Sequence, residues 1–183
     1  MLNLIGSKEN RNNNVYPLVL TGIFAGIVTV CSWITVPLPF TQVPINLAVL
    51  GVLLAGGCLG SKYGSLSILI YILLGAVGIP VFAGFGAGLG TLAGPTGGYI
   101  VGYILCAAIA GLGACCKHPI RLALCMVLGV AACYALGTLW YAHLMQTPIW
   151  AALALCVIPF IPCDALKIAA AVFLVTRLRR LLP

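Results

Sequence analysis

The stretch Asn12–Ser61, NNNVYPLVLTGIFAGIVTVCSWITVPLPFTQVPINLAVLGVLLAGGCLGS, runs for 50 residues without a single Asp, Glu, Lys or Arg. A second block of 54 residues between Lys62 and Lys117 is equally free of charge, and a third of 55 residues follows Arg121 with two charged side chains in it. A helix needs about 20 residues to cross the hydrocarbon core of a bilayer. Each block therefore accommodates two crossings and a turn, which predicts three transmembrane helical hairpins.

The composition supports a membrane location. Of the 183 residues, 63% are hydrophobic and 6% are charged, and the mean hydropathy is +1.20. A soluble domain of this length needs a polar surface that this sequence does not supply. We expect an all-α integral membrane protein in the cell membrane, with a polar tail over residues 1–14 and one six-helix membrane domain over residues 15–183.

The basic residues indicate the topology. The hairpin tips carry no Lys or Arg. The basic residues at the bases of the predicted hairpins are Lys8, Arg11, Lys62, Lys117, Arg121, Arg177, Arg179 and Arg180. This is the positive-inside pattern, and it predicts that both termini are cytoplasmic. Because the cations are scattered, the net charge of +7 is not taken as a nucleic-acid patch.

The apolar runs and their breaks place the predicted helices. They are expected at about Tyr16–Val36, Ile45–Gly60, Tyr63–Ile79, Thr96–Cys115, Ile120–Leu144 and Pro162–Leu182. Pro159 and Pro162 interrupt the last apolar run, since proline breaks or kinks a helix. We therefore expect Ile149–Ile158 to form a short helix that lies at the outer surface or dips into the membrane, and Pro162 to lie in the first turn of the sixth crossing.

Two outer loops have unusual compositions. The first, Pro37–Pro44, contains three prolines, and Gln42 and Asn46 are the polar side chains near it. The second, Pro80–Pro95, contains five glycines together with Phe82 and Phe85. Apolar rings gain little by facing water, so this loop is interpreted as a lid over a cavity, with an ordinary exposed turn as the alternative.

Asp164 and Lys167 are the charged residues inside the third block. A lone charge at the centre of the membrane costs about 2.5–3.5 kcal/mol on insertion scales. The two residues are three apart, so they share a helix face. They are either a structural ion pair or a ligand site; we favour the site, because a pair kept for stability alone is replaceable by apolar residues. The matching ligand is a small organic molecule with an N–H donor, an anion and a hydrophobic body.

Small residues repeat at a spacing of four along the first helix. Gly22 and Gly26 form one row, and Thr21, Ala25 and Thr29 form another. Such rows let another helix approach closely within lipid. The spacing is equally compatible with packing inside this bundle and with contact to a separate partner subunit.

Other classes of function have weaker support. His118 and His143 fall at opposite membrane faces, so no catalytic constellation is expected. The adjacent pair Cys115 and Cys116 lacks a second pair with ligand spacing, so neither a metal nor a cofactor is predicted. A proton-coupled or solo secondary transporter with Asp164 as proton relay is the main alternative, although no inverted repeat is evident. A structural membrane protein without a ligand is a further one.

Several segments together resemble the BioY family, the biotin-specific substrate-binding (S) components of energy-coupling factor (ECF) transporters. The segments that carry the resemblance are Leu53–Gly60, Gly75–Phe85 with the glycine-rich stretch after it, Gly94–Tyr99 and Ile158–Lys167, which matches a Pro-x-x-Pro-x-Asp-x-x-Lys pattern. The resemblance spans about residues 16–180, and it implies a six-helix S-component fold with a biotin pocket near the outer face.

The resemblance also implies partners and roles. A transmembrane coupling subunit and two ABC ATPase subunits would drive transport, with the coupling subunit at Gly22 and Gly26. Asp164 and Lys167 would contact biotin. Both outer loops, with Gly84 and Phe85 in the second and Gln42 and Asn46 near the first, would close over it. The aromatic residues expected to pack against the ligand are Phe40, Phe82, Phe85 and Tyr99.

One segment departs from the family pattern. Where members often have Pro-x-Thr-Leu-Gln-Thr, this chain has Pro44-Ile-Asn-Leu-Ala-Val49. Asn46, Ala48 and Val49 therefore stand at polar positions of the pattern. This leaves a related heterocyclic acid as an alternative ligand to biotin.

Overall fold

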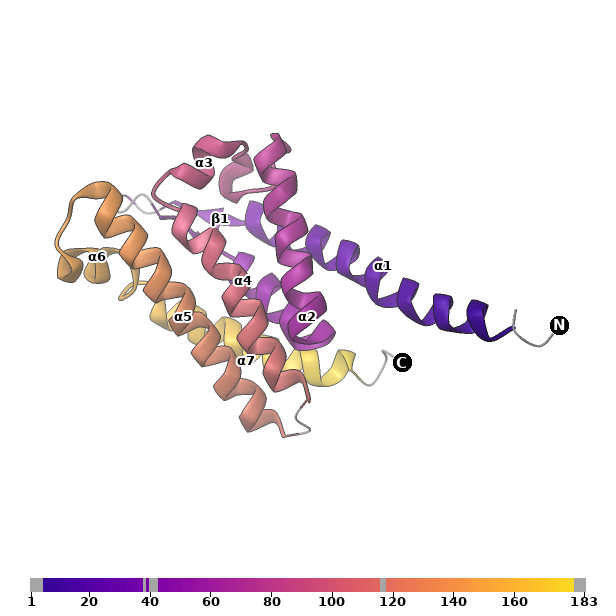
Figure 1. Ribbon diagram of the computed structural model, residues 1–183. Coiled ribbons are helices and arrows are strands. Elements are labelled where there is room, and N and C mark those ends of the chain that lie inside the picture. The colour runs from indigo at the N-terminus through magenta and orange to yellow at the C-terminus, as the bar shows by residue number, and fades with distance from the viewer. Residues whose placement is uncertain (1–4, 38, 40–42, 116–117, 180–183) are drawn as a thin grey trace.

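The computed structural model describes residues 5–37, 39, 43–115 and 118–179, with the backbone alone for residues 5–14 and for Cys115. It is almost entirely helical (Figure 1). The elements in chain order are α1 Ile5–Trp33, β1 Thr35–Val36, β2 Ile45–Asn46, α2 Ala48–Val77, η1 Ala83–Phe85, α3 Leu89–Ala93, α4 Gly97–Leu112, η2 Gly113–Cys115, α5 Pro119–Met145, α6 Ile149–Cys156 and α7 Ile161–Leu178.

Helix α2 is a hairpin of two arms that meet at Gly60. This residue has φ 79° and ψ 178°, a left-handed backbone conformation that glycine adopts without strain. The arms then pack closely, because an ideal Cβ placed on Gly64 would lie 2.7 Å from the Cα of Gly56. With α1, α4, α5 and α7, the two arms provide the six apolar helices in three hairpins that the charge spacing predicts.

The lengths of these helices vary. Val15–Trp33 of α1 and the whole of α5 are each long and apolar enough for a membrane span, and α6 and α7 satisfy the same test together despite a bend of 54°. α2 is also long and apolar over its 30 residues, but the fold at Gly60 divides it into two shorter arms. The expected short helix after Ile149 is present as α6, and Pro162 lies in the first turn of α7. The break between α6 and α7 therefore falls where the two prolines predicted it.

The predicted ends of the first two helices are wrong. Thr35–Val36 and Ile45–Asn46 form a two-stranded antiparallel ribbon instead, with Thr35 opposite Asn46 and Val36 opposite Ile45. The proline-rich loop cannot continue a helix, and its flanks pair their backbone groups with each other. At its other end α1 begins at Ile5 rather than near Tyr16, and the cytoplasmic tail over residues 1–14 stays a prediction.

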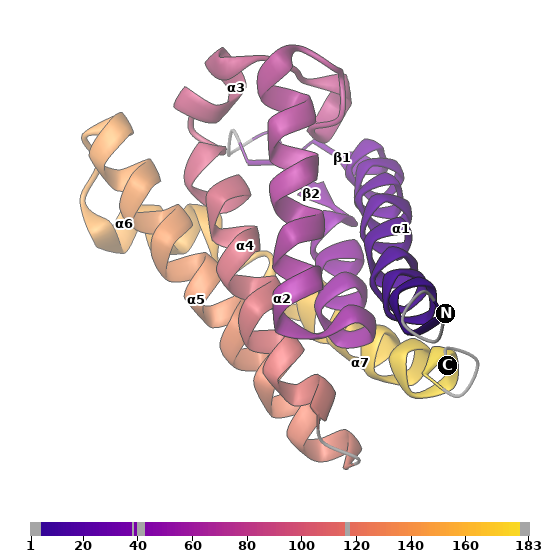
Figure 2. The ribbon, with the colours of Figure 1, turned by 45° about the vertical axis from the view of Figure 1, so that its right-hand side comes forward.

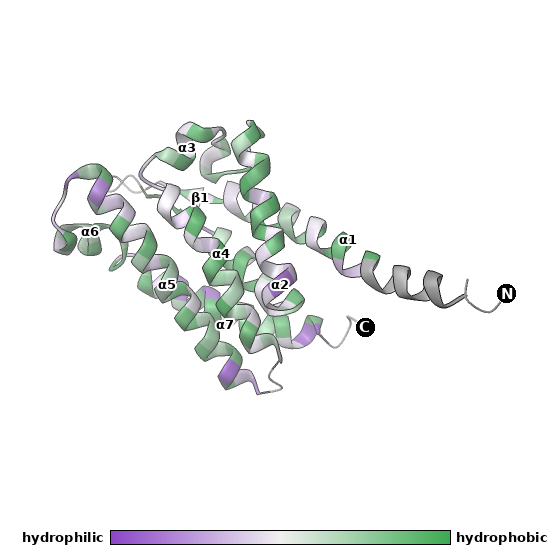
Figure 3. Cartoon of the chain, viewed as in Figure 1, coloured by the Kyte–Doolittle hydropathy of each residue, from purple (hydrophilic) through white to green (hydrophobic). Residues whose placement is uncertain are grey.

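The helices of the bundle are hydrophobic along most of their length (Figure 3), and many of their large apolar side chains are exposed. Lys62, Arg121 and Arg177 lie at the turn of α2, the start of α5 and the end of α7, which gather at one end of the molecule. The start of α1 lies toward this end too (Figure 2). α3 and the β1–β2 ribbon lie at the opposite end. This polarity suits a multi-pass membrane protein, and the cytoplasmic location of the termini stays a prediction.

The first arm of α2 and the helices around it form the core. α2 packs against α1, α4 and α7, and α4 packs against α5. α7 packs against α2 and α5, and its first turns lie in the interior of the bundle, because Asp164 and Lys167 are both buried. The first turn carries Asp164, and Lys167 follows one turn later.

Candidate ligand-binding site

The start of α7 places a carboxylate inside the bundle. Pro162 occupies the first turn, where its missing N–H is no loss, and the backbone N–H of Asp164 donates to the carbonyl of Phe160 over 2.8 Å. Asp164 is 3% exposed. The free N–H groups and the dipole at a helix N-terminus favour a negative charge there.

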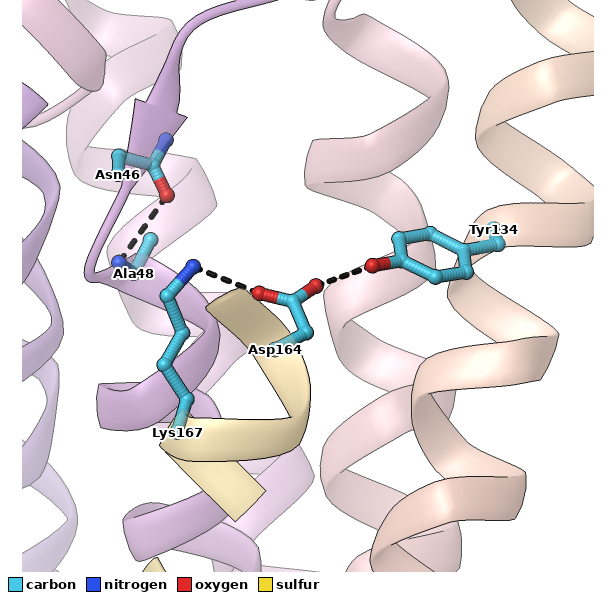
Figure 4. A network of polar contacts seen from close by, with 5 residues as sticks. All are labelled: Asn46, Ala48, Tyr134, Asp164 and Lys167. Atoms are coloured by element: carbon cyan, nitrogen blue, oxygen red, sulfur yellow. Dashed lines mark hydrogen bonds and ion pairs between the residues drawn. The ribbon is translucent and has the colours of Figure 1, made fainter. Parts of the chain in front are cut away.

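Two side chains hold this carboxylate (Figure 4). The Nζ of Lys167, one turn further along α7, lies 2.6 Å from its Oδ1. The hydroxyl of Tyr134 on α5 donates a hydrogen bond to its Oδ2. Lys167 is also buried, at 7% exposure. The carboxylate is thus joined to an ammonium on one side and to a phenol on the other.

A cavity of about 270 Å³ opens beside these groups. Its volume is near the lower end of the range for small-molecule pockets. The lining comes from all the elements around the centre of the bundle: Val43, Pro44, Asn46, Val49, Tyr71, Phe82, Ala83, Thr91, Thr96, Tyr99, Ile100, Tyr103, Cys106, Val130, Cys133, Tyr134, Cys156, Phe160, Asp164 and Lys167. Most of the wall is apolar or aromatic, with the ion pair as its charged group.

The aromatic walls are fixed by hydrogen bonds to neighbouring helices. The hydroxyl of Tyr71 lies 2.8 Å from the Oγ of Ser32 on α1. The hydroxyl of Tyr99 lies 3.2 Å from the Oγ1 of Thr138 on α5. Rings that are buried and hydrogen-bonded at their tips have little freedom to turn. The cavity therefore has a defined shape rather than a collapsible one.

Five of the residues predicted from the sequence line this cavity: Asn46, Phe82, Tyr99, Asp164 and Lys167. Asn46 comes from β2, and its Oδ1 accepts a hydrogen bond of 3.1 Å from the N–H of Ala48 at the start of α2 (Figure 4). Residues that are far apart in the sequence thus line the same cavity.

Two members of the second loop do not reach the cavity. Phe85 is 62% exposed, and its ring stacks on Trp33 with the ring centroids 5.1 Å apart. Gly84 is next to the lining residue Ala83 but is not part of the wall. The direction of the chain changes there, because Gly84 and Phe85 both have positive φ. Phe40 and Gln42 lie outside the described residues.

Part of the site was not predicted from the sequence. Tyr134 carries the second hydrogen bond to Asp164, and Tyr71 and Tyr103 form aromatic wall. Tyrosine in the middle of a transmembrane run is a usable signal, since the residue is enriched at the membrane interfaces instead. Cys106, Cys133 and Cys156 also line the cavity.

The small residues of α1 divide into two faces. Thr21, Ala25 and Thr29 are buried against the bundle. Gly22 and Gly26 are exposed, and an ideal Cβ on either would have no atom of the described chain within 4 Å. Packing inside the bundle therefore accounts for the first row and not for the glycine row.

A family model described as BioY family matches residues 7–183. The chain belongs to the BioY family. It is a multi-pass membrane protein of a family of transporters.

Individual relatives agree with this membership. The chain is 40% identical to the biotin transporter BioY of Thermotoga maritima over 90% of this chain and 96% of that one. It is 42% identical to the probable biotin transporter BioY of Pyrococcus horikoshii over 87% of this chain and 94% of that one. A crystal structure of the S-component for biotin from an ECF-type ABC transporter superposes with a TM-score of 0.86 at 27% identity, covering 92% of this chain and 93% of that one.

Proposed function

We propose that this BioY-family chain is the substrate-binding S component of an ECF-type ABC transporter and captures biotin from the extracellular side. The observation that carries the proposal is the buried pair of Asp164 and Lys167 at the wall of an apolar cavity. Burying two charges within a membrane-spanning bundle costs free energy. Binding of a polar ligand gives a reason for the chain to retain them. The relatives named as biotin transporters identify the ligand class.

The geometry of the pair suggests how it binds. The carboxylate and the ammonium are 2.6 Å apart, so they present an acceptor and a donor side by side. A ureido group offers an N–H beside a carbonyl oxygen and is complementary to such an edge. In this proposal Asp164 accepts from a ligand N–H, Lys167 donates to a ligand oxygen, and Tyr134 holds the carboxylate in place. Phe82 and Tyr99 cover the apolar part of the ligand.

Transport in this proposal depends on other subunits. A transmembrane coupling subunit meets the exposed face of α1 at Gly22 and Gly26, where a partner helix finds no side chain in its way. Two ABC ATPase subunits supply the energy from the cytoplasmic side. Lys62, Arg121 and Arg177 at one end support this orientation, because the cavity is lined in part by residues of β2, η1 and α3, which lie at the other end.

The direct test is binding of radiolabelled biotin to the purified protein. The parent should bind, the variant Asp164→Asn/Lys167→Ala should not, and Lys62→Ala should bind like the parent because Lys62 lies at the far end of the bundle. Equal binding by the double variant refutes this site. Uptake in cells that also express the partner subunits should survive an uncoupler and stop on ATP depletion; the reverse outcome favours the proton-coupled alternative.

A further inference from the structure

Two tryptophans hold the two ends of the glycine-rich loop 80–95. The Nε1–H of Trp33, the last residue of α1, donates to the carbonyl of Pro80 over 2.8 Å. The Nε1–H of Trp140 on α5 donates to the carbonyl of Gly94 over 2.9 Å. The first and the last turn of the loop are thus tied to helices on different sides of the bundle by the same kind of hydrogen bond.

The middle of this loop covers the cavity. Phe82 is 1% exposed, meets the ring of Tyr71 edge to face with centroids 5.4 Å apart, and lines the cavity with Ala83 and Thr91. Its ring fits because position 75 is glycine: an ideal Cβ there would lie 2.0 Å from the ring. The loop therefore cannot lift away from the cavity without withdrawing Phe82 from this position.

The outer side of the loop is tied to the same tryptophan. The ring of Phe85 stacks on Trp33 at an interplanar angle of 29°. Gly84 and Phe85, with φ of 64° and 60°, turn the chain so that Phe82 points inward and Phe85 outward. Trp33 thus contacts the loop twice, by its N–H and by its ring.

We propose that Trp33 and Trp140 are positioning residues that hold the loop over the cavity and set how fast the ligand leaves. This inference rests on the proposed function, since it concerns the loop above that site. Neither tryptophan lines the cavity, so each acts through the loop alone. Release of the ligand through this face requires both indole hydrogen bonds to break before Phe82 withdraws.

Anchoring in the bilayer interface is the competing explanation, because tryptophan is enriched there. Trp150, the third tryptophan of the chain, provides the matched control. It lies on α6 at 83% exposure, and no hydrogen bond of its indole appears among the contacts of the described residues. An interfacial role predicts that replacing Trp150 affects the protein as much as replacing the other two.

The experiment is stopped-flow dissociation of biotin from the full-length protein in detergent and in nanodiscs. Trp33→Phe and Trp140→Phe keep an aromatic ring and remove the N–H donor. Each should raise the dissociation rate constant by about twofold to about tenfold, the factor that one net hydrogen bond represents. The double variant should show the product of the two factors, because the sites are independent. Trp150→Phe should dissociate like the parent.

The outcomes separate the two proposals. Failure of the parent protein to bind biotin refutes the proposed function. If both Trp→Phe variants bind biotin normally and release it at the rate of the parent, the positioning role of Trp33 and Trp140 is refuted and the proposed function stands. If these variants have a lower melting temperature but an unchanged dissociation rate, the positioning role is also refuted, because a purely structural role produces that result. Phe85→Leu, which loses the stacking on Trp33 and keeps both hydrogen bonds, should accelerate dissociation less than the double variant does.

Discussion

Replacing Lys167 with methionine should destabilise the protein far more than the loss of one side-chain contact. The Nζ of Lys167 lies 2.6 Å from Asp164, and both residues are buried, at 7% and 3% exposure. Methionine has nearly the same length and removes the charge. Asp164 would then keep a buried negative charge with the Tyr134 hydroxyl as its neighbour. Removing one partner of a buried pair costs about 3–5 kcal/mol.

A second change should restore most of that stability. In Asp164→Asn/Lys167→Met both charges are gone, and the amide oxygen still accepts the hydrogen bond from Tyr134. Replacing a buried ion pair by neutral residues of similar volume is often neutral for stability. We therefore expect the single variant to melt about 6–20 °C below the parent and the double variant to melt close to it.

The assay is thermal unfolding in detergent, paired with biotin binding for each variant. Lys62→Met is the control, because Lys62 is exposed at the turn of α2 and should change neither quantity. Both variants of the pair should lose biotin binding. If the single variant melts like the parent, the buried charge is compensated by groups other than Lys167. If the stable double variant still binds biotin, the pair has no role in recognition.

Two further predictions concern the same site and the outer face of α1. Tyr134→Phe removes the hydroxyl that donates to Asp164. Calorimetry should then show biotin binding weakened by about tenfold to about a hundredfold, the range for a hydrogen bond to a charged group. Unchanged affinity would show that Tyr134 does not position the carboxylate. Gly22→Leu should leave the melting temperature unchanged and abolish co-purification of the coupling subunit. The control, Ala25→Leu on the buried face of α1, should lower the melting temperature. A lower melting temperature of the Gly22→Leu variant would contradict the exposed position of that residue.

The sequence predicts those features that depend on local spacing. Charges 50 residues apart define hairpins, because a crossing has a fixed length. Asp164 and Lys167 share a face because residues three apart on a helix are neighbours. Pro159 and Pro162 interrupt the last apolar run because proline cannot continue a helix. Each of these features depends on one segment of the chain and not on the segments that pack against it.

The features that were missed depend on contacts between segments. Tyr134 reaches Asp164 because α5 packs against α7, and no local pattern connects residues 30 positions apart. Phe82 and Phe85 both look like lid residues, and the left-handed backbone at positions 84 and 85 sends one inward and the other outward. The β1–β2 ribbon forms from residues that read as helix ends, because the pairing partner lies across the proline-rich loop.

The break between α6 and α7 explains the position of the Asp164–Lys167 pair. A continuous helix through residues 149–178 would have its N-terminus near the membrane surface, and residue 164 would lie mid-helix, away from the positive end of the helix dipole. The break starts a new helix within the bundle, so Asp164 falls in a first turn whose dipole favours a carboxylate. Irregular backbone at this depth is tolerated where it is covered by protein or lines a cavity, and Phe160 at the break lines this one. The prolines thus position the charge, and the charge gives the cavity its polar wall.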